Sequence, residues 1–474
     1  MYSYDVRIWG IRTRQSKSAP YQLRWLVGGE EHQAPFLTKT LADGRRAQLM
    51  EAVRKGEQFD VSSGLPVSEL RQLKSPTWFE HARAYVCMKW PDAAAKHRVG
   101  IAEAMTNVTM ALVTSGKSAP DPKVLRLALR TWAFQMTLDP QGNAVPRMKA
   151  EQPPAPAAQA LEWMANHSLR VSEVAEAENL RRALAAISRR LNGKRAADNT
   201  IRRKRAVLSN ALRYAVECDT LPTNPLPKVD WDPPQTDDEV DFQYVPGPEL
   251  ARRLLDAVQA QGTRGEHLHA FFGCMYYAAM RPSEVAALAK GDCKLPSTGW
   301  GELVLRRSRP EVGAGWTDGG TPYDDRGLKR RARKASRSVP VPPALVQLLR
   351  SHLDSEGLAA DGRLFRAVEG GRVGSNEYTR VWNEARRQAL QAQDVATPLA
   401  EVPYALRHAG VSLWIKAGVD PVEVARRAGH SVAVLWKFYA KILCGQQRVA
   451  NNLIDLALSD DHLDTPQAIA KPEE

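Results

Sequence analysis

Four short stretches in the C-terminal half of the chain gather arginine, lysine, histidine and tyrosine side chains that could do chemistry. The first, YYAAMRPSEVAALAKGD, places Arg281 and Glu284 three residues apart at the start of an expected helix. Taken alone, such a pair is more typical of a surface salt bridge. The apolar run FFGCMYYAAM before Arg281 indicates that this arginine projects from a packed element.

The second stretch, RGLKRRARKASRSVPVPPALVQLLR, crowds basic residues into an expected hairpin that leads into a helix. A loop of this kind can contact phosphates without doing any chemistry. Lys329 and Lys334 are its candidates for a sharper role.

The third and fourth stretches are PYALRHAGVSLWIKAGVD and PVEVARRAGHSVAVLWKFYAK. The periodic apolar residues of the third predict a helix that holds Arg407 and His408 beside a buried stripe. In the fourth, an expected helix ends at Ala428-Gly429, His430 follows, and Tyr439 lies in the next helix. A lone tyrosine in a helix is more often structural than catalytic, so its context decides.

The order of these residues resembles the catalytic domain of the tyrosine recombinases, the phage-integrase superfamily. AMRPSEVAAL resembles the first-arginine box, YALRHAGVSLW the second-arginine box, and AGHSVAVLWKFYAK the histidine-to-tyrosine segment. The whole chain looks closest to the site-specific integrases of actinobacterial phages and integrative elements. The resemblance covers about 245–455 and extends more loosely to an arm-type DNA-binding domain and a helical core-binding domain upstream.

The resemblance implies a DNA strand transesterification without metal or other cofactor. Tyr439 would attack a phosphodiester, form a 3′-phosphotyrosyl bond and release a 5′-hydroxyl, conserving bond energy for rejoining. Arg281 and Arg407 would hold the non-bridging oxygens of the transition state, because guanidinium forks match them. His430 would donate a further hydrogen bond, and Glu284 would support Arg281.

Two positions in this mechanism are open. Lys329 is the favoured general acid for the leaving oxygen, because Leu328-Lys329-Arg330 resembles the corresponding stretch of the actinobacterial group, with Lys334 as the alternative. The family's second-arginine box usually begins with histidine, whereas this chain has Tyr404. A phenol with a pKa near ~10 is a poor base at neutral pH, so either the base role is dispensable or Lys329 or water assists. His408 is expected to pack or to orient its neighbours.

Upstream, residues 1–65 are expected to form a small DNA-binding domain. Alternating apolar and polar residues in the first 40 positions predict a three-stranded sheet whose third strand is APFLTKT, and LADGRRAQLMEAVRKGEQ predicts a helix against it. The polar positions are rich in basic residues, a pattern that fits a DNA groove as well as a solvated face. They are Arg7, Arg12, Arg14, Arg24 and Lys39.

Residues 75–225 are expected to form a helical core-binding domain, interrupted by a Pro/Ala-rich loop at 139–160. A basic helix end at Arg202, Arg203 and Lys204 is expected to face a phosphate backbone. A Pro- and Asp-rich linker at 226–244 precedes the catalytic domain at 245–458, and an acidic disordered tail is expected at 459–474. The expected fold class is therefore mainly α with small β elements.

The bulk composition fits this organisation. The chain has 474 residues, 66 Lys and Arg against 53 Asp and Glu, and a net charge of +13, which favours a polyanionic partner. Five scattered cysteines offer no zinc-ligand spacing and fit a reducing compartment. No signal peptide and no apolar run of membrane-spanning length is evident, so a cytoplasmic protein is expected.

The expected partners are double-stranded DNA attachment sites and three further copies of the chain, since exchange of two duplexes needs four active sites. The segment NNLIDLAL is the candidate for exchange between protomers. A host bending protein or an excision factor is compatible with this scheme. Three alternatives stay open: a non-catalytic DNA-binding regulator on the same scaffold, a type IB topoisomerase-like or hairpin-forming enzyme, and a basic helical scaffold that binds RNA or protein.

Overall fold

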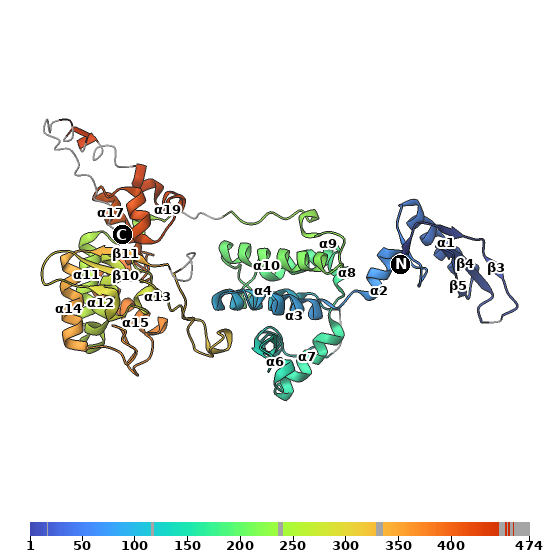
Figure 1. The fold of residues 1–474 in the computed structure, drawn as a ribbon, viewed down its shortest axis with the longest axis horizontal. Helices are drawn as coiled ribbons and strands as arrows, with labels where there is room; N and C mark the ends of the chain where they lie inside the picture. Colours follow the sequence, from blue (N-terminus) through green and yellow to red (C-terminus); the bar gives the residue numbers. More distant parts are fainter. Residues whose placement is uncertain are drawn as a thin grey trace, which may run out of the picture. The chain divides into compact units, whose positions relative to one another are not determined.

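The computed structural model describes residues 1–16, 18–114, 118–235, 240–328, 335–444, 451–452, 454–455 and 458. The chain is mainly helical with small sheets, as the sequence predicts, and divides into two compact units, Met1–Thr236 and Asp237–Glu474 (Figure 1). Within the described residues, none of the helices combines the length and apolar character needed to cross a membrane.

The chain begins with a small antiparallel sheet. Its elements are β1 (Tyr2–Ser3), β2 (Val6–Ile8), β3 (Arg12–Thr13), β4 (Tyr21–Val27), β5 (Glu30–Phe36), β6 (Phe59–Asp60) and the helix α1 (Lys39–Arg54). β5 pairs with one edge of β4, and β2 and β3 follow each other along the other edge, while β1 pairs with β6. The predicted three-stranded sheet is thus present with its first strand interrupted. The predicted third strand ends early, because Thr38 caps α1.

The register of this sheet separates an apolar face from a basic one. Leu23, Trp25 and Val27 of β4 are buried with α1. On the opposite face, Arg7 pairs with Leu26 and Arg12 with Gln22, and directly opposed residues of an antiparallel pair point to the same side. The alternation in the sequence therefore gives the basic face that it predicts.

The rest of the first unit is helical. Its elements are α2 (Val67–Lys74), α3 (Trp78–Lys89), α4 (Ala95–Ala111), α5 (Pro122–Ala128), the π-helical turn η1 (Leu129–Ala133), β7 (Met136–Leu138), β8 (Ala144–Pro146), α6 (Arg147–Ala150), α7 (Ala155–His167), α8 (Val171–Val174), α9 (Ala177–Ile187), α10 (Asp198–Glu217) and η2 (Leu226–Lys228). Helix α4 packs against α3, α9 and α10, and Figure 1 shows α3, α4 and α10 side by side.

The stretch 139–160 corrects the sequence prediction. It is not one loop: it supplies β8, α6 and the beginning of α7. Pro156 lies in the first turn of α7, where its missing N–H costs no hydrogen bond. The prediction from proline content alone therefore assigned the beginning of a helix to a loop.

The second unit is built around α12, which contacts α11, α14 and α17. Its elements are η3 (Phe242–Tyr244), α11 (Pro248–Gln259), α12 (Gly262–Tyr277), α13 (Pro282–Val285), η4 (Lys290–Asp292), β9 (Cys293–Lys294), β10 (Gly301–Leu305), η5 (Ala314–Trp316), β11 (Arg337–Val341), α14 (Pro343–Glu356), α15 (Ser375–Ala389), α16 (Ala392–Val395), α17 (Ala405–Lys416), α18 (Pro421–Ala428) and α19 (Val432–Cys444). β10 lies between β9 and β11 in an antiparallel sheet.

Some sequence predictions for this unit differ from the structure, and others concern residues that it does not describe. The helix expected from Pro282 onward is a single short turn, α13. Part of the predicted linker, η3, packs onto the unit through Phe242. Lys329, Lys334 and the tail 459–474 lie outside the described residues, and only five positions of NNLIDLAL are described.

Candidate active site

Four of the predicted site residues come from four separate elements of the second unit and lie together. Arg281 caps the N-terminus of α13, Arg407 lies in α17, His430 follows α18, and Tyr439 lies in α19. Helix α17 packs against both α18 and α19. Direct contacts join these elements across the chain, such as the hydrogen bond between Arg281 and Gly429, 148 positions apart.

Arg407 is the centre of the cluster and is fully buried. Its Nη1 donates to the carbonyl of Ala279, and its Nη2 donates to the carbonyl of Ala428 at 2.6 Å and to Nε2 of His430 at 2.8 Å. Ala279 has φ +45°, a strained value for a residue with a Cβ, and this turn directs its carbonyl to the guanidinium. The arginine is thus held in one orientation before any substrate arrives.

Arg281 is positioned by Glu284. The carboxylate accepts from the Arg281 backbone N–H at 3.0 Å and from its Nη1 at 2.8 Å, and Nη2 of Arg281 donates to the Gly429 carbonyl at 3.2 Å. These contacts hold the Arg281 guanidinium against the Glu284 carboxylate. The Arg281 side chain keeps 18% of its surface exposed, so it is the arginine of the cluster that a ligand can reach most easily.

A third arginine, Arg337 of β11, completes the cluster and was not predicted. Its Nη2 donates to Glu284 at 2.8 Å, and its Nη1 donates to the Ala428 carbonyl at 3.3 Å. Arg337 is buried on the same side of β11 as Val339 and Val341. The period-2 pattern of RSVPV could have revealed an inward arginine, but the surrounding basic run hid it.

The cluster controls the charge of its members. Burial alone would raise the pKa of Glu284, but Arg337, Arg281 and Arg407 hold it at about 2, so this fully buried carboxylate stays ionised. Burial lowers the pKa of Arg407, and the nearby Arg281 adds to that effect. One carboxylate therefore stands among three guanidiniums, and the excess positive charge favours an anion.

The protonation of His430 follows from its surroundings in this cluster. Burial and then Arg407 lower its pKa to about 3, so the imidazole is neutral. Because Nε2 accepts from Arg407, the ring proton resides on Nδ1. Among the described residues, neither Nδ1 of His430 nor Nε of Arg407 has a hydrogen-bond partner, although both are buried. Buried donors normally find partners, and an oxyanion would supply one here.

Tyr439 is buried with 1% of its surface exposed. Its hydroxyl lies 2.8 Å from Nδ1 of His408, and its ring is 6.3 Å from that of His430. Phe242 covers the phenol at a ring distance of 5.8 Å, and the Val240 N–H donates to the Phe438 carbonyl at 3.3 Å. Burial raises the pKa of Tyr439, so the hydroxyl keeps its proton in this state.

Two glycines are required by close packing. Gly429 ends α18 with φ +66°, and a Cβ there would lie 1.9 Å from Nη1 of Arg337. Gly410 lets α17 approach the end of α12, because a Cβ would lie 2.0 Å from the Tyr276 carbonyl. The sequence predicted the glycine at the end of α18 as a helix stop but not its contact with an arginine.

The residues predicted to contact DNA lie in the first unit. Arg7, Arg12, Arg14 and Lys39 are exposed, whereas Arg24 is half-buried and paired with Glu31. At the start of α10, Arg202 and Arg203 are exposed. The prediction that Lys204 faces a phosphate backbone was wrong. Its side chain is 5% exposed and forms an ion pair with Glu103 at 2.8 Å, because the inner side of α10 packs on α4.

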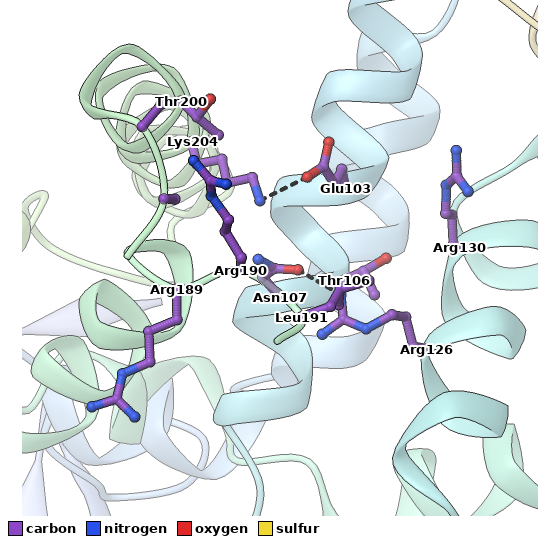
Figure 2. A pocket seen from close by; sticks show the side chains of 12 residues that line it. Glu103, Thr106, Asn107, Arg126, Arg130, Arg189, Arg190, Leu191, Thr200 and Lys204 are labelled. Carbon is purple, nitrogen blue, oxygen red and sulfur yellow. Dashed lines mark hydrogen bonds and ion pairs between the residues drawn. The ribbon is translucent and has the colours of Figure 1, made fainter. Parts of the chain in front are cut away.

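A basic hollow of about 480 Å³ lies beside this ion pair, between α4, α5, η1 and the start of α10. Figure 2 shows Lys204 and Glu103 facing each other, with Arg126 directed at Asn107, 2.8 Å away, and Arg189 directed away. The four arginines that line the hollow leave it positive, because its one carboxylate is paired. They are Arg126, Arg130, Arg189 and Arg190.

No protein-family model and no curated protein matches the chain. Solved structures with a similar course of the chain include an integrase of the transposon Tn1549 in complex with circular intermediate DNA, with a TM-score of 0.45 and 15% identity over 64% of this chain and 96% of that one. For XerH recombinase bound to difH, the TM-score is 0.42 and the identity 11%, over 77% of this chain and 97% of that one. For a λ integrase tetramer on a Holliday junction, the TM-score is 0.42 and the identity 10%, over 89% of this chain and 91% of that one.

Proposed function

We propose that the chain is a site-specific DNA recombinase that cleaves and rejoins DNA through a 3′-phosphotyrosyl bond at Tyr439, integrating or excising a mobile element. One observation carries the proposal. Arg407, fixed by its hydrogen bonds, contacts His430, whose ring lies 6.3 Å from that of Tyr439, and Nε of Arg407 and Nδ1 of His430 are buried donors without a hydrogen-bond partner among the described residues. This is the donor set that a phosphodiester needs when its oxygens gain charge.

The contacts support the following proposed roles. Arg281 and Arg407 bind the non-bridging oxygens, and His430 donates from Nδ1. Glu284 and Arg337 keep the guanidiniums in place. The leaving 5′ oxygen takes a proton from Lys329, or from Lys334, and both lie outside the described residues. The guanidiniums supply the charge stabilisation that a metal ion supplies in other phosphoryl-transfer sites.

Tyr439 must become accessible before it reacts. The segment with Val240 and Phe242 lies over it, so DNA binding has to displace this segment or move α19. Four protomers on two duplexes are the expected assembly, and NNLIDLAL remains the candidate segment for contact between them. Accessory bending or excision proteins are compatible with the proposal.

The test does not need a known attachment site. The full-length protein is incubated with a pool of duplexes that carry a randomised core and one nick, and protein-linked DNA is recovered after SDS and phenol extraction. The nick lets the short cleaved fragment diffuse away, so the covalent complex accumulates. We expect enrichment of one sequence family with wild type and none with Tyr439→Phe, whose DNA binding should persist.

Other outcomes identify the alternatives. Sequence-specific binding with no covalent product indicates a regulator on this scaffold. Covalent capture without sequence preference, together with relaxation of plasmids, indicates a topoisomerase-like enzyme. A covalent product that survives in Tyr439→Phe contradicts the assignment of the nucleophile.

A further inference from the structure

The contact between His408 and Tyr439 has a chemical meaning that the predicted packing role does not cover. His408 lies one residue after Arg407, and α17 and α19 bring its Nδ1 to 2.8 Å from the Tyr439 hydroxyl. The phenol keeps its proton, and a buried hydroxyl needs an acceptor. Nδ1 of His408 is the acceptor that the structure gives it.

The protonation state of His408 fits an acceptor. Burial, and then the positive charge of Arg407, lower its pKa to about 4, so the imidazole is neutral at neutral pH. Among the described residues, the titratable and charged groups around it are Tyr404, which precedes α17, Arg407 of α17, Tyr439 of α19, and His430 of the turn between α18 and α19. None of these is a carboxylate that would favour the imidazolium before a substrate binds.

We infer that His408 is the general base that takes the proton of Tyr439 during cleavage, in place of the residue at position 404. This inference rests on the proposed function. Tyr404 stacks edge-on against the His408 ring at 5.1 Å and lies 5.9 Å from the Arg407 guanidinium. The phenol at position 404 thus acts as a positioning residue that fixes the imidazole one helical turn further on.

The step balances in both directions. The Oη–H bond of Tyr439 breaks and its proton moves to Nδ1 of His408, while an Oη–P bond forms and the P–O5′ bond breaks. The leaving O5′ takes a proton from the separate general acid. In rejoining, the 5′-hydroxyl returns its proton to the deprotonated general acid as its oxygen attacks phosphorus and the P–O5′ bond forms. The P–Oη bond breaks, and the imidazolium of His408 returns its proton to Oη.

The bound phosphate explains why the base acts only with substrate present. In the empty site, the pKa of the phenol is raised and that of the imidazole is lowered, so proton transfer is uphill. A phosphodiester bound by Arg281 and Arg407 adds a negative charge next to His408, and this charge favours the imidazolium. Premature ionisation of Tyr439 is thereby avoided.

The decisive variant is His408→Asn in the full-length protein. The amide oxygen can occupy the place of Nδ1 and accept a hydrogen bond, but it cannot take a proton, so positioning and base catalysis are separated. The assay is single-turnover cleavage of the nicked duplex recovered with wild type, at saturating protein between about pH 5 and 9. We expect a loss of roughly 100-fold or more at neutral pH.

The pH profile is the readout that a structural role would not change. For wild type the cleavage rate should fall as pH falls through the pKa of His408 in the DNA complex, because the protonated imidazole cannot accept the proton of Tyr439. His408→Asn should lose this acidic limb and gain a rate that rises with hydroxide. Added imidazole should partly restore cleavage by His408→Ala. A substrate with sulfur at the 5′ bridging position removes the need for the acid but not for the base, so His408→Asn should stay slow on it.

A matched control is His352→Gln, at another buried histidine of the same unit. Nε2 of His352 forms a hydrogen bond with the Leu364 carbonyl. It should keep the wild-type pH profile. The inference is overturned if His408→Asn cleaves like wild type, or if its rate falls equally at every pH with the acidic limb intact. Absence of any covalent product with wild type would instead contradict the proposed function, before the variant is considered.

Discussion

The cluster around Arg407 and the hollow beside Lys204 both concentrate arginines, but they hold them in opposite ways. In the cluster, Arg407 and Arg337 are buried, and carbonyls and a carboxylate fix their guanidiniums. In the hollow, Arg130, Arg189 and Arg190 are exposed side chains. Fixed, desolvated charge suits the stabilisation of a transition state, whereas exposed surface charge suits sequence-independent binding of a phosphate backbone.

The largest expected effect lies in the cluster. Arg407→Lys keeps a positive charge but removes the fork, so cleavage should fall by about 100- to 1,000-fold or more while DNA binding persists. Single-turnover cleavage and filter binding measure the two quantities. Arg363→Lys, at another buried arginine that pairs with Asp361, is the matched control and should cleave normally. Normal cleavage by Arg407→Lys would show that the cluster is only structural.

The second effect is on stability and depends on pH. The pKa of Glu284 is about 2 in the fold, below the ordinary value of 4.5. Ionised Glu284 therefore stabilises the fold fully above about pH 4.5, and this contribution, roughly 3 kcal/mol, is lost as pH falls toward 2. Glu284→Gln should be less stable than wild type in urea unfolding at pH 7, and the difference should shrink on acidification. A difference that is constant with pH would contradict the charge role.

The hollow should show a smaller effect, confined to binding. Arg190→Gln should weaken binding of any duplex several-fold and reduce the slope of log affinity against log salt by about 1, the value expected for one lost phosphate contact. Cleavage at saturating protein should not change. Arg213→Gln, at an exposed position of α10 that does not line the hollow, is the matched control. An unchanged salt slope in Arg190→Gln would remove the hollow from the DNA-binding surface.

The smallest effect is expected at the N-terminal sheet. Replacing Arg7 and Arg12 by alanine should lower affinity for accessory sites but leave binding to the crossover sequence nearly unchanged, because these side chains lie on the outer face of a separate sheet. Gel-shift titrations with both kinds of site measure this. Lys55→Ala, at the end of α1, serves as the control. Equal loss at both sites would argue against a separate arm-binding role.

The sequence predicted the parts of this molecule that depend on local patterns. Helix α18 with its glycine stop follows from residue spacing, and the order of Arg281, Arg407, His430 and Tyr439 led to one site. Arg337 escaped prediction because its burial depends on how β11 packs against Glu284, 53 residues away. The contact of His408 with Tyr439 likewise depends on the angle between two helices. Lys204 was mispredicted because charge says nothing about which side of α10 faces α4.

Gly429 shows how much of the site can depend on a residue without a side chain. Its carbonyl accepts a hydrogen bond from Arg281, and its backbone conformation ends α18. The guanidinium of Arg337 lies where a Cβ of this residue would be. A random mutagenesis screen for lost recombination should therefore recover changes at Gly429 as often as changes at the arginines themselves. Such alleles would mimic active-site mutants genetically, although no atom of the glycine takes part in the proposed reaction.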